Sequence, residues 1–165
     1  MNRVSKLAAS AVLATTLFTS GMSTAQANRS MLNTFNFDHP AFVKSYPFAK
    51  AHVIIQVSDD DPANWNLALN NAVNMLDYMG EDRIQIVIVF YGPGLKMLLP
   101  ESKMGERIAS LNDEGVEFDA CYNTMENMAR KLGHLPVLVP QAVIVPSGVI
   151  RIVQLESHGF TYIKP

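Results

Sequence analysis

The 165-residue sequence contains a single cysteine and a single tryptophan, and charged residues make up 17% of it, with a formal net charge of -2. It has no cluster of lysine and arginine of the kind that follows a phosphate backbone, so we expect no nucleic-acid partner. A lone cysteine excludes an intramolecular disulfide. That cysteine and the scattered histidines show no metal-ligand spacing, and no nucleotide-binding glycine motif is present. We therefore expect no metal and no cofactor.

The sequence also lacks any apolar run of the roughly 20 residues that a membrane-spanning helix needs. Its first 27 residues instead have the three parts of a signal peptide. Two basic residues come first, an apolar run follows over 7–18, and Ala25-Gln26-Ala27 provides a small-x-small cleavage site. An uncleaved anchor is the alternative, but the run is short for one. We expect cleavage after Ala27 and a periplasmic protein without membrane attachment, with full secretion as the second possibility.

The rest of the chain divides into an arm and one domain. Residues 28–50 are rich in Asn, Ser, Phe and Pro and have no sustained period, so they predict an irregular N-terminal arm. Over 51–165, short apolar runs alternate with amphipathic stretches. Strands are expected at 51–57, 83–90, 116–120, 142–145 and 160–163, and helices at 62–79, near 102–114, from about Asn123 to Leu132, and at about 149–158. This alternation predicts an α/β fold, a three-layer α/β/α domain around a mostly parallel sheet of about five strands.

Capping residues sharpen three helix boundaries. Asp61 followed by Pro62 is a favourable helix start, and Gly80 ends that helix because glycine adopts the left-handed conformation without a Cβ penalty. Asn123 and Glu126 have the spacing of a capping box and predict the start of another helix.

Ligands of open α/β sheets bind at the carboxyl ends of the strands, and Cys121 is expected at such an end, just before a helix. Unpaired N–H groups at a helix start favour an anion, so this position favours the nucleophilic thiolate. The alternative is a small buried core residue. No histidine can be placed beside Cys121 from spacing, so a Cys–His hydrolase is not favoured.

Three further segments share that edge of the predicted sheet, namely Ser58–Asp61, Tyr91–Gly94 and Pro146–Gly148. The Gly92-Pro93-Gly94 loop could let the backbone approach a ligand closely. The run Asp59-Asp60-Asp61 could bind a cation, although helix capping already explains it. The candidate substrate-binding residues are Ser58, Asp59, Gly92, Pro93, Gly94, Tyr122, Asn123 and Thr124.

Five segments together resemble the DsrE-like (DsrE/DsrF) family. They are QVSDDDP at 56–62, VFYGPG at 89–94, GVEFDACYNT at 115–124, VPSGVIR at 145–151 and GFTYI at 159–163, in the family's order. The resemblance covers roughly residues 50–165. It implies a compact α/β/α domain that assembles into trimers or hexamers.

Better-studied members of this family relay sulfur as a persulfide on a cysteine at the place of Cys121. Asn123 and Thr124 match the segment that follows this cysteine in a less characterised branch, whereas Tyr122 stands where that branch often has glycine. The resemblance implies a periplasmic sulfur carrier or sulfurtransferase-like protein, with a sulfane-sulfur donor and an acceptor thiol protein as partners. A non-enzymatic oligomeric binding module and a redox-sensing thiol protein are the alternatives.

Overall fold

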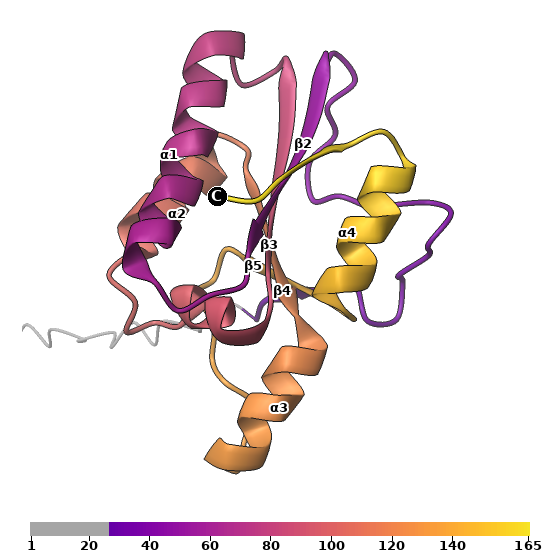
Figure 1. Ribbon diagram of the computed structural model, residues 1–165. Coiled ribbons are helices and arrows are strands. Elements are labelled where there is room, and N and C mark those ends of the chain that lie inside the picture. Colours follow the sequence, from indigo (N-terminus) through magenta and orange to yellow (C-terminus); the bar gives the residue numbers. More distant parts are fainter. Residues whose placement is uncertain (1–26) are drawn as a thin grey trace, which may run out of the picture.

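The computed structural model describes residues 27–165, which build one parallel sheet with helices around it (Figure 1). The strands are β1 (Arg29–Ser30), β2 (Ala51–Val57), β3 (Ile84–Phe90), β4 (Glu117–Cys121), β5 (Ala142–Val145) and β6 (Thr161–Ile163), in the spatial order β1-β5-β4-β3-β2-β6. The helices are α1 (Pro62–Met79), α2 (Gly105–Asp113), α3 (Tyr122–Leu132) and α4 (Gly148–Ser157), with a 3₁₀ helix η1 at Gly92–Leu98.

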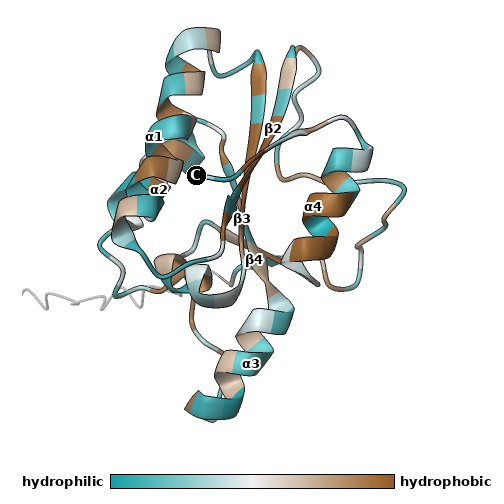
Figure 2. Ribbon diagram, in the orientation of Figure 1, coloured by the Kyte–Doolittle hydropathy of each residue, from teal (hydrophilic) through white to brown (hydrophobic). Residues whose placement is uncertain are grey.

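Three layers are visible in Figure 1, with α1 and α2 on one face of the sheet and α4 on the other. β3 is buried along its whole length, as expected of a strand that is apolar on both faces and covered on both. Figure 2 shows the central strands and the inner side of α1 as the most hydrophobic parts of the chain. The predicted α/β/α fold is therefore confirmed.

The helix α3 departs from this layering. It projects from the carboxyl edge of the sheet (Figure 1), and Met125 is its only buried residue. The predicted capping box at Asn123 is wrong, because β4 runs directly into α3 and Cys121 becomes the N-cap residue. At α1 the prediction is confirmed, since the Asp61 side chain accepts a hydrogen bond from the Ala63 amide and Gly80 ends the helix with φ of 85°.

The N-terminal arm (residues 28–50) is irregular over most of its length, but it contributes a sixth strand that the sequence pattern did not predict. β1 pairs with the edge of β5 through only two polar residues, too few to create a periodic pattern. Beyond β1, Gln154 of α4 donates hydrogen bonds to the carbonyls of Asn36 and Phe37. The arm is thereby held along α4.

The predicted signal peptide lies outside the described residues except for Ala27. Within residues 27–165, no helix is long and apolar enough to cross a membrane.

A close backbone approach fixes the start of η1. A Cβ atom added to Gly94 would lie 2.4 Å from the Val57 carbonyl oxygen and 2.9 Å from the Ser58 nitrogen. Both atoms belong to the backbone and cannot move aside. The structure thus gives Gly94 a packing role against the end of β2.

We predict that Gly94→Ala lowers the free energy of unfolding by roughly 1–3 kcal/mol, the usual cost of overpacking. Gly105→Ala is the matched control, because a Cβ atom there meets nothing within 4 Å. Urea unfolding of both variants measures the difference. Equal stability of the two variants would contradict the steric argument.

Candidate functional site

Cys121 is the last residue of β4, pairs with Val145 of β5 and is the N-cap residue of α3. It is 4% exposed. Gly148, the first residue of α4, packs directly against it, since a Cβ atom at Gly148 would lie 3.3 Å from the Cys121 Cβ and 3.1 Å from the Tyr91 Cβ. The ends of β3 and β4 and the starts of α3 and α4 therefore meet at this thiol.

The two helices that start near Cys121, α3 and α4, both lack a side-chain cap. The N-cap residues are Cys121 for α3 and Ser147 for α4, and neither side chain accepts a hydrogen bond from its helix. Of the first amides of α3, that of Asn123 donates to the Pro146 carbonyl at 3.3 Å. Two helix N-termini thus lie at the end of the sheet that carries Cys121, and helix N-termini favour nearby anions.

Thr124 connects the predicted loop at Gly92 to the same site. Its Oγ1 accepts a hydrogen bond from the Gly92 amide at 2.9 Å. Tyr122 is half-buried and packs against the main core, whereas Asn123 and Pro93 are exposed. The structure thus brings Gly92, Thr124 and Cys121 together at the carboxyl edge of the sheet.

Ser58 and Asp59 lie at the end of β2, in a shallow notch beside Lys164 and Pro165. Ser58 borders the Gly92 loop, because a Cβ atom at Gly92 would lie 3.5 Å from the Ser58 carbonyl oxygen. Asp59 organises the start of α1. Its side chain accepts from the Asp61 amide at 3.1 Å, and its carbonyl accepts from the Trp65 indole at 2.9 Å.

The acidic run of residues 59–61 is engaged within the fold. Asp60 forms an ion pair with Lys96, and Asp61 caps α1. Across residues 27–165, no three His, Cys, Asp or Glu side chains gather as a metal site would require.

A buried ionic cluster, which the sequence analysis missed, lies on the same face of β4 as Cys121. Side chains of a strand alternate between faces, so Glu117, Asp119 and Cys121 all point toward α4. There the fully buried Arg151 donates from Nε to Asp119 at 2.8 Å and from Nη2 to Glu117 at 3.1 Å. It also donates from Nη1 to Gln154 at 2.8 Å. We call these four residues, Arg151, Asp119, Glu117 and Gln154, the Arg151 cluster.

Two carboxyl groups in this cluster share one guanidinium. Burial, followed by the charge of Asp119, raises the pKa of Glu117 to about 8. Burial also raises the pKa of Asp119, although Arg151 opposes this shift. The Asp119 Oδ1 atom is buried and accepts no hydrogen bond, which suits a proton held between the two acids. At neutral pH Glu117 is therefore mostly protonated.

Among the comparisons with known proteins, only the one with solved structures finds similar proteins. No protein-family model matches the chain, and no curated protein matches it in sequence. A protein of unknown function, MTH1491 from Methanobacterium thermoautotrophicum, is similar with a TM-score of 0.63 and 28% identity, over 70% of this chain and 100% of that one. The ychN protein of E. coli is similar with a TM-score of 0.55 and 13% identity, over 70% of this chain and 98% of that one.

A conserved protein of unknown function, BT1422 from Bacteroides thetaiotaomicron, is similar with a TM-score of 0.53 and 16% identity, over 73% of this chain and 100% of that one. These likenesses support the α/β/α fold.

The retained proton makes stability depend on pH. Between the ordinary carboxyl range and about pH 8, the folded chain holds a proton at Glu117 that the unfolded chain releases. We predict that the free energy of unfolding falls as pH rises from about 5 to about 8 and then levels off. Denaturant unfolding at several pH values measures this slope.

Glu117→Gln removes the titrating group and keeps the side-chain shape, so its stability should vary less over the same pH range. Glu126→Gln, an exposed change on α3, is the control and should retain the slope of the unmodified protein. An unchanged slope in Glu117→Gln would show that the proton is held elsewhere.

Proposed function

We propose that the protein is an exported, DsrE-like sulfur carrier or sulfurtransferase that holds a persulfide on Cys121. The observation that carries this proposal is the position of Cys121, where two uncapped helix N-termini meet at the carboxyl edge of a parallel sheet. The motif order of the DsrE-like family, with its cysteine at this position, supports the same chemistry.

The proposed reaction needs the Cys121 thiol, a sulfane-sulfur donor and an acceptor thiol. The Cys121 thiolate attacks the outer sulfur of thiosulfate, a new S–S bond forms, and the donor's S–S bond breaks with its electron pair leaving on sulfite. The thiolate of an acceptor protein then attacks the outer sulfur of the Cys121 persulfide and regenerates the Cys121 thiolate. The helix amides stabilise the anionic sulfur in both steps.

The near-complete burial of Cys121 constrains how a donor reaches it. Residues packed beside it include Gly148, at the start of α4, and the half-buried Tyr91, and we refer to these two residues as the cover of Cys121. Access therefore requires this thin cover to move. The cover belongs to a helix start and a loop, elements that move more readily than the core strands.

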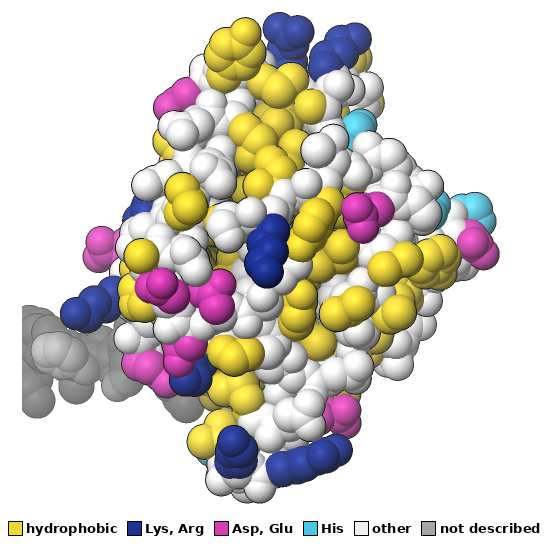
Figure 3. Space-filling model, in the orientation of Figure 1, with side chains coloured by type: hydrophobic (Ala, Val, Ile, Leu, Met, Phe, Trp, Pro, Cys, Tyr) yellow, Lys and Arg dark blue, Asp and Glu magenta, His cyan; other side chains and the backbone are white. Residues whose placement is uncertain are grey.

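Apolar side chains near this cover support the proposal that the chain forms a homo-oligomer, a trimer or hexamer, as in the family. Val149, Ile150 and Val153 of α4 are each about half exposed, at 52%, 46% and 47%. Figure 3 shows apolar side chains on the side of the molecule that α4 occupies. Exposed apolar residues gathered on one helix are typical of a protein contact.

A second candidate function, a non-enzymatic binding module, is favoured by the 4% exposure of Cys121, since buried free cysteines usually serve packing. A redox-sensing thiol is the third candidate, and it predicts a reversible sulfenic acid or an intermolecular disulfide.

We predict that incubation with thiosulfate adds sulfur to the protein, visible in intact mass, and that a reducing thiol removes it. Cys121→Ser should gain nothing, and because Cys121 is the only cysteine, no other thiol can contribute. Absence of an adduct on the unmodified protein, or an equal adduct on Cys121→Ser, would refute the carrier.

Alkylation kinetics separate the carrier from the binding module. For a carrier, the rate of modification of Cys121 by iodoacetamide should rise through about pH 6–8 as the thiolate forms. A structural cysteine should react slowly at every pH and fully only after denaturation. The denatured chain supplies the reference rate.

A further inference from the structure

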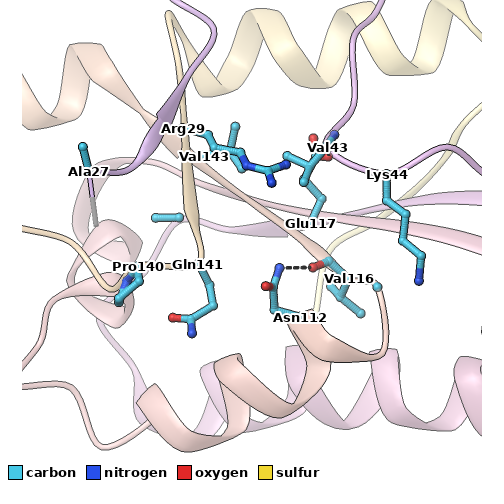
Figure 4. Close-up of a pocket in the computed structure, with 12 residues that line it drawn as sticks. Ala27, Arg29, Val43, Lys44, Asn112, Val116, Glu117, Pro140, Gln141 and Val143 are labelled. Carbon is cyan, nitrogen blue, oxygen red and sulfur yellow. Dashed lines mark hydrogen bonds between the residues drawn. The ribbon is translucent and has the colours of Figure 1, made fainter. Parts of the chain in front are cut away.

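A pocket lies at the other end of β4 from Cys121 (Figure 4). Its volume is about 280 Å³, and it is lined where β4 and β5 begin, where α2 ends and where the arm passes. We call it the basal pocket. Glu117 lines it and is the first residue of β4, whereas Cys121 is the last, so four residue steps or about 13 Å separate the two sites.

Two cations from different elements line the basal pocket. Arg29 comes from β1 and Lys44 from the arm. Within residues 27–165, neither has an acidic partner within ion-pair distance. Figure 4 shows Arg29 extending from β1 toward the side of the pocket formed by Val43 and Glu117.

The position of Lys44 is fixed by its surroundings. Its Nζ lies over the Tyr46 ring, 5.5 Å from the centroid, and a Cβ atom at Gly115 would be 3.1 Å from Nζ. The Tyr46 hydroxyl in turn donates to the Gly115 carbonyl. The ammonium group is therefore held beside Gly115, which itself lines the pocket.

The acidic wall of the basal pocket is neutral at pH 7. Glu117 accepts a hydrogen bond from the Val43 amide at 2.7 Å and another from Arg151 at 3.1 Å. Its raised pKa of about 8 keeps it protonated. The fully buried Asp119 leaves Oδ1 without a partner, as expected if the two acids share this proton. The ionisable groups lining the pocket thus carry two positive charges and no negative one.

The remaining lining suits a small molecule with a short carbon chain. Val43 and Pro140, which are both exposed, provide apolar surface. Asn112 donates to the Val116 carbonyl at 3.0 Å, which fixes its side chain and leaves its amide oxygen available (Figure 4). A volume of about 280 Å³ admits a molecule smaller than a typical drug.

We propose that the basal pocket binds a small organic anion, with its carboxylate or phosphate group between Arg29 and Lys44 and its carbon chain against Val43 and Pro140. This site does not use Cys121 and is independent of the sulfur-carrier proposal.

Binding should weaken at high pH because Glu117 then becomes negative. The charged and titratable groups that face it are Asp119, Arg151, Tyr46, Lys44 and Arg29. Tyr46, whose pKa burial raises to about 12, stays neutral at pH 9. The Glu117–Asp119 pair is therefore the group whose charge changes.

The test is calorimetric titration of the full-length chain with glutarate and, separately, with inorganic phosphate. Expression without export keeps the peptide bond at Ala27, so no terminal amino group titrates in the pocket. We expect binding at pH 7, weakened about tenfold by Arg29→Gln or by Lys44→Gln, the usual effect of losing one charge-assisted hydrogen bond. Lys131→Gln, on α3, is the matched control and should bind as the unmodified protein does.

At pH 9 the unmodified protein should bind about tenfold more weakly, whereas Glu117→Gln should keep its pH 7 affinity. Circular dichroism verifies that this variant is folded, and if it is not, the Arg29 and Lys44 variants decide. Comparison of the two probes distinguishes a carboxylate ligand from a phosphate one. No binding of either probe at about 10 mM, an equal loss in Lys131→Gln, or a pH effect that persists in folded Glu117→Gln would overturn the proposal.

Discussion

The guanidinium of Arg151 connects three parts of the chain, β4, α4 and the N-terminal arm. It donates four hydrogen bonds, to Asp119 and Glu117 of β4, to Gln154 one turn further along α4, and to the Ala41 carbonyl of the arm. The side chain has no exposed surface. A buried charge is tolerated only when it is paired and hydrogen-bonded, and loss of one partner typically costs roughly 3–5 kcal/mol. Arg151, together with the hydrogen bonds that Gln154 donates to the arm, therefore holds α4 and the arm against the sheet.

Both candidate sites depend on that arrangement. Arg151 lies three residues after Gly148, and its amide donates to the Ser147 carbonyl, so the same helical turn carries the guanidinium and the residue packed against Cys121. At the other end of the strand, Glu117 joins the cluster to the wall of the basal pocket. The Phe42 ring adds apolar cover, lying 5.0 Å from the Arg151 guanidinium and 5.6 Å from the Phe160 ring.

The fold could be predicted from sequence because its signals are local. The apolar runs of β2 and β3, the Asp61 cap and the glycine at position 80 each depend on residues within a few positions of one another. The position of Cys121 was predicted in the same way, from a strand end followed by a helix. The Arg151 cluster could not be predicted in this way, because Arg151 is more than 30 residues away from Asp119 and Glu117 in the sequence. The alternation of Glu117, Asp119 and Cys121 within one strand was the available signal.

Charge along β4 also bears on the chemistry proposed for Cys121. Asp119 is two residues from Cys121 on the same face of the strand, about 7 Å away. If both carboxyl groups of the Arg151 cluster were ionised, the cluster would carry a net negative charge close to the sulfur and would oppose a thiolate or a persulfide anion. With Glu117 protonated, Arg151 faces one carboxylate fewer, and the cluster carries less negative charge near the sulfur. The proton on Glu117 thus favours the anionic sulfur proposed for Cys121 at one end of β4 and leaves the acidic wall of the basal pocket uncharged at the other.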